Sequence, residues 1–147
     1  MNVSFEEIIY SSPDYDECLA LRYKVLREPL GLDYTEDQIL QEWNQKHFIL
    51  RDVQGRIIAC LVFHLQPEEV LKMRQVVVTE DLQSKGLGKK LIEQAEIWAI
   101  QNQFKKIVLC ARDLAVPFYL KLGYTRVGEE FLEVGIPHIE MYKQLQI

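Results

Sequence analysis

The sequence lacks several features that identify whole classes of protein. No apolar run among its 147 residues approaches the roughly 20 residues that a membrane-spanning helix needs. The first residues show no basic region followed by an apolar block, so we expect no secretory signal peptide. Long linkers, low-complexity tracts and internal repeats are also missing. We therefore expect one cytoplasmic globular domain over residues 1–147, with no membrane partner.

Cysteine is scarce, and its three copies are widely spaced. Cys18, Cys60 and Cys110 are odd in number and stand in apolar surroundings. This pattern is typical of reduced, buried thiols in a cytosolic protein and is unlike a disulfide framework. No cysteine–histidine spacing resembles a zinc site, so we expect no metal.

Basic residues are in the minority. The chain has 17 lysines and arginines against 22 acidic residues, a formal net charge of −5. This balance disfavours non-specific binding of nucleic acid, which needs a basic surface. It permits attraction of a cationic substrate such as an amine.

Hydrophobic patterning predicts alternating strands and helices. Ser12 is suited to cap a first helix that Pro29 and Gly31 end, and Thr35 with Gln38 forms a capping box for a second. In chain order, we expect a strand at 3–10, a helix within 11–31, a short helix after Thr35, strands at 47–52, 56–65 and 70–80, a helix from the glycine-rich stretch to about 103, a strand at 105–111, a helix at 114–123 capped by Asp113, and strands at 124–127 and 138–142. The segment 70–111 should form a right-handed parallel crossover.

The stretch "LQSKGLGKKL" places Lys85, Lys89 and Lys90 at a predicted helix start. Lysine is disfavoured there because the unpaired N–H groups of a helix start carry partial positive charge. Gly86 and Gly88 allow close backbone approach and positive φ, so the stretch indicates a site for a phosphate or pyrophosphate. It matches neither the P-loop nor the dinucleotide fingerprint. Taken alone, it also fits a turn with solvated lysines.

The surrounding sequence adds to this motif. "VVV" at 76–78 precedes "QSKGLGKKL" at 83–91, and "VPFYLKLGY" follows at 116–124. Together they resemble the GNAT superfamily of acyl-CoA-dependent N-acetyltransferases, with its Gln/Arg-x-x-Gly-x-Gly/Ala pyrophosphate loop and its Phe-Tyr-x-Lys-Leu-Gly-Tyr segment. The ending "GEEFLEVGIPHIEMY" is similar to small bacterial members of unassigned substrate. Where some members carry Asn, this chain has Arg112 and Asp113, which leaves the contacts near the pantetheine and thiol open.

The resemblance implies a fold, an acyl donor and a set of residues that bind it. It implies an α/β (α+β) fold with a mixed central sheet of six to seven strands and about four helices, and acetyl-CoA as donor without a metal. The Val78 N–H would also polarise the thioester carbonyl. The cofactor-binding residues it implies are Val76, Val77, Val78, Gln83, Ser84, Lys85, Gly86, Leu87, Gly88, Lys89, Lys90, Asp113, Val116, Phe118, Tyr119 and Lys121.

Tyr119 matches the family's frequent general acid, which protonates the departing thiolate, although it could simply pack on the cofactor or core. The general base is open. His138 is the first candidate, with Glu133, Glu80 and Glu140 as others, but a structural role in the last hairpin is an alternative for His138. Cys110 is interpreted as an inert thiol.

Candidates for contact with the acceptor are Arg22, Arg74, Tyr34 and Trp43, although both arginines could equally be ion-paired. His47 is interpreted as a surface residue and His64 as an edge or core residue.

Three functions remain open from the sequence. The first is direct acetyl transfer from acetyl-CoA to a primary amine of a small molecule, peptide or protein. The second is a catalytically silent CoA-binding regulatory module of the same fold, and the third is an unrelated phosphate-binding protein. Acyl groups other than acetyl stay open, as does the oligomeric state, for which the resemblance allows a homodimer.

Overall fold

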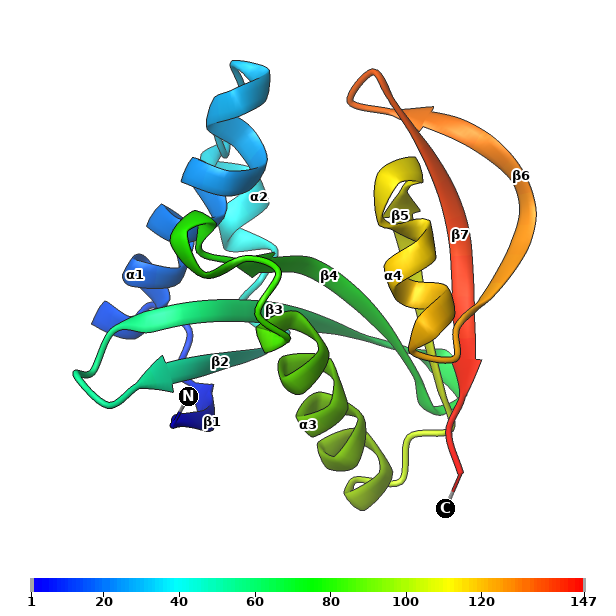
Figure 1. Ribbon diagram of the computed structural model, residues 1–147, viewed down its shortest axis with the longest axis horizontal. Helices are drawn as coiled ribbons and strands as arrows, with labels where there is room; N and C mark the ends of the chain where they lie inside the picture. Colours follow the sequence, from blue (N-terminus) through cyan, green and yellow to red (C-terminus); the bar gives the residue numbers. More distant parts are fainter. Residues whose placement is uncertain (1, 147) are drawn as a thin grey trace.

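The computed structural model describes residues 2–146, in which seven strands form one sheet flanked by helices (Figure 1). The sheet order is β1-β2-β3-β4-β5-β7-β6, and β4–β5 is the parallel pair while the other neighbours are antiparallel. The predicted element order and mixed sheet are confirmed. The elements are β1 Val3–Ile8, α1 Pro13–Arg22, α2 Glu36–Leu40, β2 Lys46–Asp52, β3 Ile57–Gln66, β4 Val70–Val78, α3 Leu87–Gln101, β5 Lys106–Arg112, α4 Val116–Lys121, β6 Thr125–Glu133 and β7 Ile136–Gln144.

Local signals in the sequence set several of these boundaries. The Ser12 hydroxyl accepts a hydrogen bond from the Tyr15 N–H at 3.3 Å and caps α1 as predicted. At α2, the Thr35 hydroxyl accepts from the Gln38 N–H, and the Gln38 side chain accepts from the Thr35 N–H, which completes the capping box. Gly55, at φ +89°, makes the predicted turn between β2 and β3.

The first helical run ends at Gly31 as predicted, where φ is +68°, but it is not one α-helix. It leaves α geometry after Arg22 and continues as a π turn over Tyr23–Arg27 and a 3₁₀ turn over Glu28–Leu30, which contains Pro29. The predicted cap of α4 and the bounds of the last two strands were wrong. Asp113 does not cap α4, because its carboxylate accepts from the adjacent Leu114 N–H and the helix begins at Val116. The last two strands extend well beyond 124–127 and 138–142. The length of β6 was underestimated because all its residues are exposed, so that no alternating pattern marks the strand.

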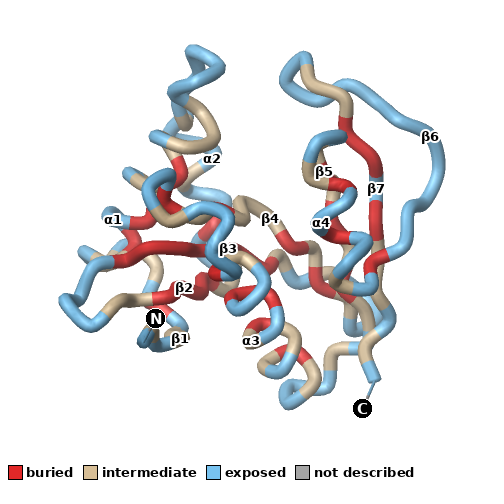
Figure 2. The backbone as a smooth tube through the Cα atoms, in the orientation of Figure 1, coloured by how far each residue is buried: buried red, intermediate tan, exposed pale blue. Residues whose placement is uncertain are grey.

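The core lies on both faces of the sheet (Figure 2). Alternation along β2 sends Phe48 and Leu50 to one face and Ile49 to the other. The first face packs against α3 and α4, and the second packs against α1 through Tyr15 and Cys18. No helix within residues 2–146 combines the length and apolar character needed to cross a membrane.

The sheet divides between β4 and β5. The two strands pair only where Val70–Lys72 meets Lys106–Val108, and beyond this point they diverge (Figure 1). Opposite β3, the register advances two residues from Cys60 to Val62 but three along β4, so β4 contains a bulge. Gln75 lies in this bulge at φ +55°. The bulge bends β4 next to the opening between the two strands.

Candidate functional site

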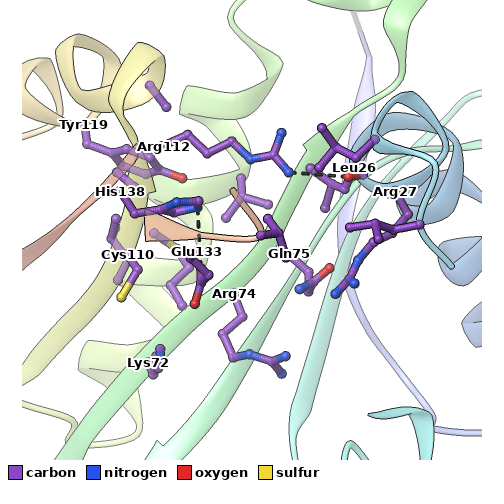
Figure 3. A pocket seen from close by; sticks show the side chains of 18 of the residues that line it. Leu26, Arg27, Lys72, Arg74, Gln75, Cys110, Arg112, Tyr119, Glu133 and His138 are labelled. Carbon is purple, nitrogen blue, oxygen red and sulfur yellow. Dashed lines mark hydrogen bonds and ion pairs between the residues drawn. The ribbon is translucent and has the colours of Figure 1, made fainter. Parts of the chain in front are cut away.

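A cavity of about 500 Å³ occupies the opening between β4 and β5 (Figure 3). Its volume suits a small molecule or the end of a chain-like ligand. Six parts of the fold contribute its walls, namely the two diverging strands, the segment after α1, the helix α2, the start of α4 and the hairpin of β6 and β7. The lining residues include Leu26, Arg27, Lys72, Met73, Arg74, Gln75, Val76, Leu109, Cys110, Ala111, Arg112, Ala115, Tyr119, Glu133, Val134 and His138.

Tyr119 lies in this cavity wall and is otherwise buried, with a relative exposure of 8%. Its ring packs edge-on against Phe118 and Tyr124. Its hydroxyl has no hydrogen-bond partner among residues 2–146, and burial raises the pKa of Tyr119 above its ordinary value. The phenol is therefore protonated at neutral pH and free to donate to a bound group.

His138 and Glu133 enter the cavity from β7 and β6 (Figure 3). The His138 Nδ1 lies 2.8 Å from the Ile136 carbonyl oxygen, and the Nε2 lies 3.4 Å from a Glu133 carboxylate oxygen. Both neighbours are acceptors, so a neutral imidazole can donate to only one of them. His138 thus contacts its own hairpin and also lines the cavity. It therefore fits both the structural and the catalytic interpretation. Of the other bases considered, Glu80 and Glu140 do not line this cavity.

Four cationic side chains also line the cavity: Arg27, Lys72, Arg74 and Arg112. Arg74 lies 3.6 Å from Glu42 and donates to Gln45 at 2.8 Å. Within residues 2–146, no carboxylate oxygen lies within 4.0 Å of Arg27, Lys72 or Arg112. Arg112 instead reaches across the opening toward the Leu26 carbonyl oxygen, 3.4 Å away (Figure 3).

Arg22 is not available to an acceptor. It is 1% exposed, and its guanidinium donates two hydrogen bonds, at 2.8 and 2.7 Å, to the Glu42 carboxylate. Tyr15 donates a third bond to Glu42 at 2.8 Å. His47, interpreted as a surface residue, is also buried here, with Nε2 3.1 Å from the Glu42 carbonyl oxygen. An ion pair of Arg22 was one of the alternatives open from the sequence, but its partner Glu42 was not identified because the two residues meet only in the folded chain.

Tyr34 connects the buried cluster to the cavity. Two guanidinium groups lie over its ring: that of Arg22 is 4.9 Å and that of Arg27 is 4.4 Å from the ring centre. Its hydroxyl donates at 2.6 Å to the Gln75 side chain in the β4 bulge. Tyr34 therefore supports the wall from behind, whereas Trp43 is 69% exposed and is not part of the lining. Gln75 and Arg27 were not singled out from the sequence, since neither a bulge nor a π turn leaves a recognisable pattern.

The glycine-rich stretch forms a separate surface at the start of α3. Ser84 and Gly86 have φ values of +65° and +81°, and Gly86 is the residue before the helix. The first hydrogen bond of the helix runs from the Lys90 N–H to the Gly86 carbonyl oxygen, and no side chain caps the end. The N–H groups of Leu87, Gly88 and Lys89 are thus left for a ligand or solvent.

The polar side chains of this stretch face solvent, whereas Leu87 and Leu91 are in the core and Leu82 packs against it. Lys85, Lys89 and Lys90 are exposed, and an added Cβ at Gly86 would meet nothing within 4 Å. Gly88 has a different task, because a Cβ there would lie 3.3 Å from the Phe118 ring and 3.7 Å from Val78. Gly88 therefore allows α3, α4 and the end of β4 to pack closely.

The other predicted cofactor residues are spread over three environments. Val76 lines the cavity, while Val77 and Val116 are buried in the core. The Gln83 side chain donates to the Val78 carbonyl oxygen at 3.0 Å and holds the loop against the end of β4. Ser84, Asp113, Phe118 and Lys121 are exposed.

The cysteines and the acidic residues show no further site. Cys18 and Cys60 are buried, and burial raises the pKa of the Cys110 thiol at the cavity. The described residues include no cluster of three or more histidine, cysteine or acidic side chains that could hold a metal ion.

A family model described as an acetyltransferase (GNAT) domain matches residues 18–145. A UPF0039 protein of Schizosaccharomyces pombe is 32% identical over 101 residues, which make up 67% of each chain. The solved structure of a candidate N-acetyltransferase from Lactobacillus plantarum is 25% identical, covers 97% of this chain and 99% of that one, and has a TM-score of 0.86. An aminoglycoside 6′-N-acetyltransferase complexed with coenzyme A shares the fold at a TM-score of 0.81, with 16% identity over 98% of both chains.

Proposed function

The chain belongs to the GNAT acetyltransferase family and is an acyltransferase, and from this premise we propose that it transfers the acetyl group of acetyl-CoA directly to a primary amine. The acceptor amine would belong to a small molecule or a peptide. The observation that carries the proposal is the cavity between β4 and β5, which is lined by Tyr119 and His138 and bordered by a strand edge without a partner strand.

The residues at the start of α3 fit the pyrophosphate of such a donor. The helix has unpaired N–H groups and no capping side chain, and the space beside Gly86 is open. Lys85, Lys89 and Lys90 supply positive charge around it, and this charge would otherwise oppose the helix dipole. We assign the pyrophosphate to this loop, with Gln83 and Ser84 shaping it.

The diverging part of β4 fits the pantetheine arm. Beyond Lys72, the edge of β4 that faces β5 has no partner strand, so its backbone groups are free to pair with an extended amide-containing ligand. Val76, Val77 and Val78 would contribute backbone groups while their side chains pack in or against the core. Bound acetyl-CoA would supply the activated acetyl group at the cavity.

Proton movements are then assigned to groups in the cavity wall. His138, with Glu133 beside it, would accept a proton from the ammonium form of the acceptor and leave a nucleophilic amine. Tyr119 would donate its hydroxyl proton to the departing sulfur. The Val78 N–H is assigned to polarise the thioester carbonyl. Two protons leave the nitrogen in all: His138 would take the first before attack, and the second would leave as the N–acetyl bond forms and would return to the Tyr119 phenolate. The sulfur gains the one proton that Tyr119 donates, so exchange of the S–acetyl bond for an N–acetyl bond releases one net proton, which passes from His138 to solvent.

Thermal unfolding with CoA, acetyl-CoA and ATP, followed by thiol release across a panel of amines and peptides, tests this function. We expect stabilisation by both CoA forms but not by ATP, and thiol release that depends on an acceptor. Stabilisation without thiol release on any acceptor would instead indicate a silent CoA-binding module. The absence of stabilisation by either CoA form would overturn the proposal.

A further inference from the structure

The cavity has its carboxylate on one side and the guanidinium groups of Arg27 and Arg112 on the other, while Lys72 lies near Cys110, as Glu133 does. Glu133 is the carboxylate in the lining, and it lies beside His138 on the side of β6 and β7. Arg27 faces them from the π turn after α1, and Arg74 projects from β4 (Figure 3). A ligand that spans the cavity therefore meets negative charge at one end and positive charge at the other.

The cationic wall of the cavity, formed by Arg27 and Arg112, has no carboxylate among residues 2–146 to neutralise it. Arg74 shares the Glu42 carboxylate with Arg22, and Arg27, Lys72 and Arg112 have no carboxylate within 4.0 Å in the described part of the chain. This concentration of cations stands out in a protein with a net charge of −5. Because low-dielectric walls concentrate the field in a cleft, the local charge determines which ligands enter.

The guanidinium of Arg27 has an aromatic partner in the cavity wall. It lies over the Tyr34 ring, 4.4 Å from the ring centre, and the buried Arg22 lies 4.9 Å from the same ring. A guanidinium group fits carboxylate or phosphate oxygens in a paired, bidentate geometry. The wall is therefore suited to recognise an anion on the acceptor.

On the basis of the proposed acetyl transfer, we propose that the acceptor is a small zwitterionic amine. Its ammonium end lies near Glu133 and His138, and its anionic end, a carboxylate or phosphate-like group, is bound by Arg27 and Arg112. Neutral amines and polyamines lack the group that this wall recognises.

Matched acceptors test the inference. Glycine, β-alanine and γ-aminobutyrate are each compared with their amide, and γ-aminobutyrate is further compared with aminopropylphosphonate, butylamine and putrescine. We expect at least one carboxylate or phosphonate to exceed its neutral partner about tenfold or more in kcat/KM, as a charge-assisted hydrogen bond warrants. The carboxylate and phosphonate arms separate the two kinds of anion. Equal or better use of the amides, butylamine or putrescine would overturn the inference.

Variants connect the preference to the wall. Arg27→Gln and Arg112→Gln should raise KM for the preferred anionic amine about tenfold and leave KM for acetyl-CoA and for butylamine unchanged. Arg126→Gln, on the exposed strand β6 and outside the cavity lining, is the matched control and should change none of these values.

Failure of this inference is distinguishable from failure of acetyl transfer. Thiol release that favours neutral amines would overturn the zwitterion inference and leave the transferase proposal standing. Should no amine support thiol release, calorimetry of γ-aminobutyrate and aminopropylphosphonate with the CoA-bound protein decides: binding that Arg27→Gln weakens supports the anion site, and no binding overturns it.

Discussion

Single residues of the same type have different roles here, according to their partners. Arg22 is locked against Glu42 in the interior, while Arg27 and Arg112 line the cavity without a carboxylate. Tyr15 donates to Glu42, whereas the Tyr119 hydroxyl is free. The sequence identified Tyr119 through its motif, but it could not separate the arginines, because the partner of each lies far away along the chain.

Replacing Tyr119 with phenylalanine tests the general acid. Tyr119→Phe should lower kcat by about 10²- to 10⁴-fold and leave CoA affinity unchanged, because only the donated proton is lost. Steady-state rates and CoA titration measure the two effects. Tyr142→Phe, on β7 outside the cavity lining, is the control. An unchanged kcat in Tyr119→Phe would assign this side chain to packing.

The pH profile gives a second check on Tyr119. Burial raises its pKa above the ordinary value of 10.0, so the acid form persists to higher pH than in an exposed tyrosine. We therefore expect no fall in kcat due to this group below about pH 10. A descending limb near neutrality that disappears in Tyr119→Phe would contradict this.

Glu42 should contribute to stability through its buried ion pair with Arg22. Burial by itself would raise its pKa, but the hydrogen bonds and charge of Arg22 outweigh burial and hold the pKa below the ordinary 4.5. Glu42→Gln leaves the Arg22 charge buried without a counter-charge and should cost about 3–5 kcal/mol of unfolding free energy at pH 7. Urea denaturation measures this cost, with the exposed Glu130→Gln as control.

The same pair predicts how stability depends on pH. A folded-state pKa below the unfolded value adds stability that is complete above about pH 4.5 and is lost as the pH falls further. The difference between wild type and Glu42→Gln should therefore shrink on acidification. A difference that stays constant between pH 7 and the acid transition would show that the charge of Glu42 is not the source.

At the scale of elements, sequence signals succeeded where they are local. The capping box at Thr35 and the turn at Gly55 depend on residues a few positions apart, and both were confirmed. The π turn after Arg22 and the bulge at Gln75 were missed because no local residue pattern marks either one. Strand β6 was predicted too short because its residues are all exposed.

For the lysines at the start of α3, we predict opposite effects on CoA binding and on stability. Lys85→Ala and Lys89→Ala should each weaken CoA binding, and this loss should diminish at high salt. In the absence of CoA, the same variants should be as stable as wild type or up to about 1 kcal/mol more stable, because a cation at a helix start is unfavourable. Calorimetry and urea denaturation measure the two quantities, with the exposed Lys24→Ala as control. Unchanged CoA affinity in both variants would contradict the charge assignment.

The whole molecule is a sheet held open in its middle. The strands β1 to β4 and the group of β5, β7 and β6 meet at only a short parallel ladder. The cavity and the free edge of β4 follow from this division. The resemblance in the sequence predicted the fold and the glycine-rich pyrophosphate loop. It did not predict the charged lining of the cavity, because the residues of that lining come from β4, β5, the π turn and the last hairpin, which meet only in the folded chain.

Hydrogen exchange tests which segments of the chain bind CoA. CoA should slow exchange in peptides that cover β4 and the loop to Lys90, because their free N–H groups would gain acceptors. Peptides from the exposed strand β6 serve as the internal reference and should not change. Protection confined to β1 and α1 would place the ligand elsewhere.

The most direct test of the account is to follow a labelled acetyl group. The protein is incubated with acetyl-CoA carrying ¹³C in its acetyl group and with the preferred amine, and the products are observed by NMR while released thiol is measured. We predict an N-acetyl amide signal that grows in a one-to-one ratio with free thiol and is nearly lost in Tyr119→Phe. Thiol release accompanied by free labelled acetate, with no amide signal, would contradict acetyl transfer to an amine.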